Sequence, residues 1–202
     1  MGFKLESMDH VFPVPVLRFD IANAAALNRD LSREIAARRA AEPGISRSNV
    51  DGWHSERDFF LRQEPAHQAL ALDLLRIMAE ATRTFDPDAD YSNVKLIPDG
   101  WVNVNPPGAM NAPHSHRGWF WSGCYYVDVP AGAGGIEFLN PGEALPGEAV
   151  IGGPLVADRA GYEPRAGQVI LFPATLDHWV YPNRSGTDRI SIAFNGKFVA
   201  KA

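Results

Sequence analysis

Three histidines and one arginine in the second half of the chain have the types and spacing of a metal site beside an anion site. His114 and His116 stand two residues apart, directly after the stretch NPPGAMNAP. Side chains at positions i and i+2 of a strand point to the same face, so both imidazoles can reach one metal ion. The pair alone fits two structural histidines equally well. His178, which follows the apolar run QVILF and a short turn, is the candidate third ligand.

Arg189 supplies the candidate anion site. Ten residues stand between His178 and Arg189, which opens the run RISIAF. In a strand, Arg189 and Ser191 face one way while Ile190 and Ile192 face the other. An arginine that points into a barrel needs an anion there, because an unpaired buried guanidinium is very costly. We therefore expect an anionic ligand close to the histidines.

The elements before residue 93 are expected to lie around these residues. Val11 to Phe19 predicts an irregular or edge strand, since its two prolines cannot donate to a ladder. Ile21 to Ala41 and Ala66 to Phe85 each carry apolar residues at helical spacing, which predicts two amphipathic helices. The first of these helices should end at the sequence Glu42-Pro43-Gly44.

From Val94 onward, short β-branched and aromatic runs alternate with Gly/Pro-rich turns. These runs are VKLI, WVNVN, WSGCYYVDV, GGIEFL, GQVILF, HWVY and RISIAFNGKFV. Seven or eight short strands predict a sandwich or barrel. The chain is thus expected to be α+β and mainly β. It should form one domain over residues 1–202, with an N-terminal strand and outer helices in 1–92 and the barrel in 93–202.

Composition excludes several classes of partner. The net charge of −5 and the lack of a basic run argue against nucleic acid. No segment has the length and apolar content of a membrane span. A single cysteine, Cys124, fits a reducing compartment. We expect a cytoplasmic protein with a small-molecule substrate, as a monomer or a homodimer.

At this point the sequence resembles a known family. The segment NPPGAMNAPHSH resembles the prolyl-hydroxylase-like pattern Y-x-x-G-x5-H-x-D, with Asn105 in the tyrosine position and His114 as the first ligand. The order H-x-H, then H, then R-x-S resembles the superfamily of 2-oxoglutarate- and iron(II)-dependent oxygenases. Within it, the chain is most similar to a bacterial family that carries H-x-H.

The resemblance implies a double-stranded β-helix, a jelly-roll or cupin-like barrel. It also implies Fe(II) held by His114, His116 and His178, with 2-oxoglutarate and O2 as co-substrates. The far carboxylate of 2-oxoglutarate would meet Arg189, Ser191 and Tyr126. The implied activity is that of a dioxygenase, an oxidoreductase that hydroxylates a small molecule or an amino-acid side chain.

Some assignments stay open at this point. Asn103 and Asn105 share a face with Trp101, and they fit contacts to the co-substrate or a buried polar network equally well. His116 stands where most of the superfamily has a carboxylate, and Glu137 is the only near candidate to supply one.

The spacing also resembles cupins, so a three-histidine dioxygenase or isomerase without 2-oxoglutarate is one alternative. A non-catalytic binding barrel is the other. Arg189 and Ser191 favour the 2-oxoglutarate enzyme, because cupins do not require that motif. Finally, the glycine-rich segment Pro141 to Arg165 is either a cover over the metal or a plain connection.

Overall fold

The computed structural model describes residues 4, 7, 12–142 and 156–201, and within them two antiparallel sheets face each other. The larger sheet has the order β1 (Leu17–Asp20), β9 (Gln168–Pro173), β6 (Trp121–Asp128), β11 (Arg189–Ala200), β4 (Val94–Asn105) and β3 (Trp53–His54). The smaller sheet has the order β2 (Asn49–Val50), β5 (Met110–His114), β10 (His178–Val180), β7 (Ile136–Leu139) and β8 (Arg159–Tyr162). The predicted barrel is confirmed.

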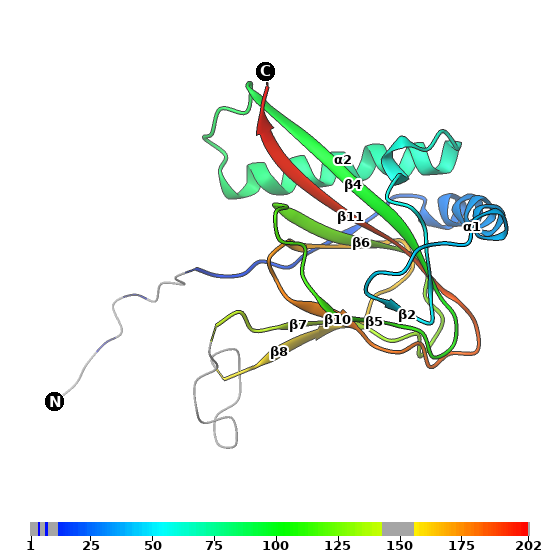
Figure 1. The fold of residues 1–202 in the computed structure, drawn as a ribbon. Helices are drawn as coiled ribbons and strands as arrows, with labels where there is room; N and C mark the ends of the chain where they lie inside the picture. Colours follow the sequence, from blue (N-terminus) through cyan, green and yellow to red (C-terminus); the bar gives the residue numbers. More distant parts are fainter. Residues whose placement is uncertain (1–3, 5–6, 8–11, 143–155, 202) are drawn as a thin grey trace.

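Two helices cover the outer face of the larger sheet, so the molecule has three layers (Figure 1). They are α1 (Ala24–Ala41) and α2 (Pro65–Phe85), and a short 3-10 helix, η1 (Phe59–Leu61), precedes α2. Helix α1 ends where Glu42 precedes Pro43, because the residue before a proline avoids helical dihedrals. Helix α2 begins at Pro65, which needs no intrahelical donor in the first turn. Neither helix is long and apolar enough to span a membrane, and no other described helix is.

The main hydrophobic core lies between the helices and the larger sheet. Leu70, Leu74 and Met78 recur at four-residue spacing along α2 and are fully buried. They pack with Leu31 and Ile35 of α1 against the outer face of the sheet. A smaller apolar cluster, with Tyr126 at its edge, lies in the interior between the two sheets. The helices thus stabilise the larger sheet from outside and leave its inner face free for a site.

The N-terminal part of the chain adds strands to both sheets. Strand β1 lies at the edge of the larger sheet, as the prolines before it predict. Strands β2 and β3 arise from the polar stretch after α1, for which no strand was predicted; β2 pairs with β5 and β3 with β4. Residues before Val94 are therefore part of the barrel wall.

Part of the segment from Pro141 to Arg165 is not a loop. Residues 159–162 form β8, which pairs with β7 at the edge of the smaller sheet. Their sequence, RAGY, is too short and too weakly β-prone to predict a strand. Residues 143–155, the main subject of the cover hypothesis, lie outside the described residues.

Candidate active site

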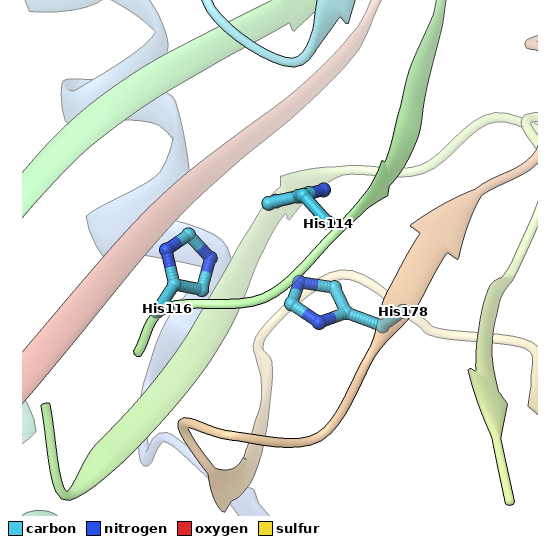
Figure 2. A group of neighbouring side chains, drawn as sticks. All are labelled: His114, His116 and His178. Carbon is cyan, nitrogen blue, oxygen red and sulfur yellow. The ribbon is translucent and has the colours of Figure 1, made fainter. Parts of the chain in front are cut away.

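Three histidine rings converge between the sheets (Figure 2). His114 ends β5 and is paired with His178, which begins β10. His116 lies two residues beyond β5, where its backbone N–H donates to the carbonyl of Ala174 at 2.8 Å. One ligand atom from each histidine lies within 4.8 Å of the others. The predicted triad is placed to bind a metal, although His116 reaches it from beyond the strand end and not by strand alternation.

Backbone carbonyls fix the ring orientation of two of these histidines. Nδ1 of His114 lies 2.7 Å from the carbonyl oxygen of Ala112, and Nδ1 of His178 lies 2.9 Å from that of Leu176. A carbonyl oxygen can only accept, so each Nδ1 carries the proton and each Nε2 keeps a free lone pair. This is the arrangement in which imidazoles bind metals.

Burial keeps the triad neutral. It lowers the pKa of His114, lowers that of His116 to about 3 and lowers that of His178 to about 4, with His114 adding to the last two shifts. Neutral imidazole is the form that coordinates a metal ion, so little proton release is needed on binding. The donor set therefore fits a divalent ion such as iron(II).

Arg189 lies on the inner face of the larger sheet and is only 1% exposed. Its Nη1 donates to the carbonyls of Ala133, Gly134 and Tyr181, at 2.6, 3.2 and 3.2 Å. Within the described residues no carboxylate pairs with it. Nη1 is thus held by backbone, and residues 12–142 and 156–201 supply no counter-ion for the charge of the guanidinium.

Tyr126 and Ser191 lie beside Arg189 as predicted. Ser191 of β11 is paired with Tyr126 of β6, and both are buried. Burial raises the pKa of Tyr126 well above its usual value, so its phenol is a neutral donor. Cys124 joins this group, and burial raises the pKa of its thiol to about 11. A cation with two neutral hydroxyl donors can bind a carboxylate.

One cavity connects the histidines to the arginine. The residues that line it are Ser48, Trp101, Asn103, Asn111, His114, His116, Ser122, Gly123, Cys124, Tyr126, Ile136, Phe172, His178, Val180, Arg189, Ser191 and Ala193. A ligand that chelates a metal at one end and carries a carboxylate at the other could therefore meet both groups.

The two asparagines of β4 lie in different surroundings. Asn103 lines the cavity, and its Oδ1 is buried with no partner among the described residues. Asn105 is not part of the cavity lining. Its Nδ2 lies 3.4 Å from Oδ1 of Asn111, and Asn111 does line the cavity. A direct role in co-substrate binding is thus supported by position for Asn103, whereas Asn105 could act through Asn111.

Glu137 does not belong to the metal site. The pairing of β10 with β7 sets His178 opposite Phe138 and Trp179 opposite Glu137, so the carboxylate lies on the other face of the sheet. There it accepts hydrogen bonds from Trp179 Nε1 at 2.7 Å and from the Tyr181 hydroxyl at 2.8 Å. The candidate carboxylate ligand is wrong, because register and not sequence distance decides which face a side chain reaches.

Several residues of the cavity were not predicted. Ser48 comes from the segment before β2, and Asn111 lies three residues before His114. Strand alternation would have placed Asn111 on the opposite face from His114, and the register irregularity in the pairing of β5 with β10 brings both into the cavity. No sequence signal marks Ser48, because β2 has only two residues.

Comparison with known proteins agrees with this geometry. Residues 99–195, which include the triad and Arg189, match the model of the family described as "Putative 2OG-Fe(II) oxygenase". None of the curated protein sequences matches the chain.

Several solved structures share the fold. A prolyl-4-hydroxylase from Pseudomonas putida is 19% identical, with a TM-score of 0.58 over 90% of this chain and 91% of that one. SnoN, a non-heme alpha-ketoglutarate-dependent epimerase, is 16% identical, with a TM-score of 0.64 over 93% and 79%.

HygX from Streptomyces hygroscopicus, solved with nickel and 2-oxoglutarate bound, is 14% identical, with a TM-score of 0.60 over 91% and 83%. These likenesses confirm the predicted double-stranded β-helix. Over residues 99–195, which carry the triad and Arg189, this chain matches the 2OG-Fe(II) oxygenase family, and the match indicates an oxygenase that depends on iron(II) and 2-oxoglutarate.

Proposed function

We propose that this oxygenase hydroxylates a C–H bond of a small molecule or an amino-acid side chain, with His114, His116 and His178 as its metal ligands. The observation that carries the proposal is the buried charge of Arg189, which no carboxylate of the described residues pairs, in the same cavity as the triad. A guanidinium in that state is costly unless an anion joins it. This favours 2-oxoglutarate over a three-histidine chemistry that lacks a carboxylate co-substrate.

Different residues of the cavity would bind different parts of the co-substrate. When bound, iron(II) and 2-oxoglutarate supply oxidation of the substrate by O2, with release of succinate and carbon dioxide. Arg189, Tyr126 and Ser191 hold the far carboxylate and so fix the direction in which the co-substrate lies. The amide of Asn103, between these groups and Trp101, offers further polar contact.

Relatives and net charge both favour a small molecule or an amino-acid side chain as the substrate. One relative is a prolyl-4-hydroxylase, and another is a prolyl hydroxylase solved with a peptide fragment. SnoN is an epimerase from nogalamycin biosynthesis. These cover side-chain and small-molecule substrates, and the net charge of −5 disfavours nucleic acid.

The test begins with binding of the two co-substrates. Anaerobic protein with saturating iron(II) and 2-oxoglutarate should develop the visible absorption band of the iron–keto acid chelate. Under air, succinate should form above the uncoupled background when pooled metabolites or peptides contain the substrate. Absence of the chelate band in a protein that binds iron would contradict the proposal and favour a three-histidine enzyme.

A further inference from the structure

The segment before β2 brings a hydroxyl group directly to the metal centre. Oγ of Ser48 lies 3.5 Å from Nε2 of His114 and lines the cavity. The carbonyl of Ser48 accepts the backbone N–H of Ala112 at 2.8 Å, and the next residue, Asn49, is paired with Asn111. Ser48 is therefore fixed by main-chain bonds to the strand that carries His114.

The turn around Ser48 is itself well held. Oδ1 of Asn49 accepts the backbone N–H of Arg47 at 2.7 Å, and its Nδ2 donates to the carbonyls of Ile45 and Gly52 at 3.2 and 2.8 Å. One asparagine thus ties both sides of the turn together. The backbone accordingly fixes Cα and Cβ of Ser48, and only rotation about its single side-chain bond, χ1, moves the hydroxyl.

Metal binding would remove the acceptor near Ser48. Nδ1 of His114 carries the proton, so Nε2 holds the lone pair that a metal takes. Among the described residues, this nitrogen is the one polar side-chain group within hydrogen-bond reach of Oγ. A half-buried hydroxyl that loses its acceptor gains by finding another.

We propose that Ser48 is a co-substrate-binding residue, whose hydroxyl donates to a metal-bound oxygen atom of 2-oxoglutarate. The inference rests on the proposed function. Ser48 lies next to a metal-binding nitrogen, and the keto acid brings its own oxygen atoms to the metal. The keto acid chelates through an ionised carboxylate, so its oxygen atoms at the metal carry negative charge whatever the other ligands are. A charge-assisted hydrogen bond is stronger than one between neutral groups.

The proposal separates two ends of the same ligand. Ser48 acts at the metal end, whereas Arg189 acts at the far carboxylate. Oxalate chelates metals but is too short to carry a distant carboxylate. Ser48→Ala should therefore weaken the binding of both 2-oxoglutarate and oxalate, whereas Arg189→Met should weaken only 2-oxoglutarate.

The experiment is an anaerobic titration of Ser48→Ala, first with iron(II) and then with either anion. Ser46→Ala, an exposed change in the same segment, is the matched control. Iron(II) affinity should stay within about twofold of the wild type, because Ser48 is not a ligand. Both anions should bind on the order of tenfold more weakly, the size of a hydrogen bond to a charged group. The chelate band should also shift.

If Ser48→Ala binds both anions with the affinity of the wild type and its chelate band is unchanged, the inference is overturned. Loss of iron(II) binding in that variant would overturn it too, by making Ser48 a metal ligand or a structural residue. If the wild type itself forms no chelate, the proposed function fails first, so the two failures are distinguishable.

Discussion

Replacing Arg189 by methionine separates a functional from a structural role for the buried charge. In the folded protein, Nη1 of Arg189 donates to three backbone carbonyls. Losing these bonds costs about 1 kcal/mol each. Removing a buried guanidinium without a counter-ion returns several kcal/mol. The two effects are similar in size, so the stability of the ligand-free protein should change by less than about 2 kcal/mol.

Arg189→Met should weaken the binding of 2-oxoglutarate by more than it changes the stability of the ligand-free protein. Removing one partner of a buried charge pair costs about 2–5 kcal/mol of binding free energy. Even the lower value raises the Kd for 2-oxoglutarate by about 30-fold. At a concentration of 100 times the wild-type Kd, 2-oxoglutarate stabilises the wild type by about 2.7 kcal/mol. At the same concentration, the variant gains less than about 1 kcal/mol.

Thermal unfolding in the presence of zinc(II), which is redox-inert, measures this difference. For a chain of this length, 1 kcal/mol shifts Tm by about 2–4 °C. The wild type should gain about 5–11 °C with 2-oxoglutarate and Arg189→Met less than about 4 °C. Arg184→Met, an exposed arginine near the start of the same strand, is the control and should behave as the wild type. A full shift in Arg189→Met, or a collapse of its ligand-free Tm, would refute the assignment.

Three further changes test other parts of the structure. His178→Ala should abolish stoichiometric iron(II) binding in an anaerobic titration while leaving the far-UV circular dichroism spectrum unchanged; undiminished binding would exclude this histidine as a ligand. Glu137→Gln should leave iron(II) affinity unchanged, because the carboxylate lies on the outer face of its sheet and bonds Trp179; weaker iron binding would reinstate it as a ligand. Glu34→Ala should lower the free energy of unfolding in urea by about 1–2 kcal/mol, because Glu34 accepts the N–H groups of Ala66 and His67 at the start of α2; an unchanged midpoint would show that water replaces this cap.

The two long helices and the candidate site residues on the strands could be predicted from the sequence. The two helices follow from apolar residues at helical spacing, which their burial against the larger sheet confirms. The triad and Arg189 meet because strands β5, β10 and β11 carry them to the interior of one barrel. Residue type and order were sufficient here, since each side chain sits at or near the end of a recognisable strand.

Short strands, and the face of a sheet that a given side chain reaches, could not be predicted from the sequence. Strands β2, β3 and β8 have two to four residues each, too few to show a period. Ser48 could not be predicted as a cavity residue, because only the pairing of β2 with β5 brings it there. From the sequence, Glu137 stayed open as a carboxylate ligand, because only the register of β7 against β10 decides which face its side chain reaches. The cytoplasmic location and the homodimer stay predictions.

The place of β11 in the larger sheet bears on how the enzyme is made. Among the described residues, β11 follows all other strands in sequence, yet it lies between β6 and β4 near the middle of the sheet. A ribosome therefore releases the two flanking strands long before the strand that joins them. Sheets closed by such distant pairings fold slowly, and their open edges attract other chains in the meantime. Until β11 has been made, β6 and β4 therefore lack the strand that joins them, and the anchoring arginine arrives with that strand.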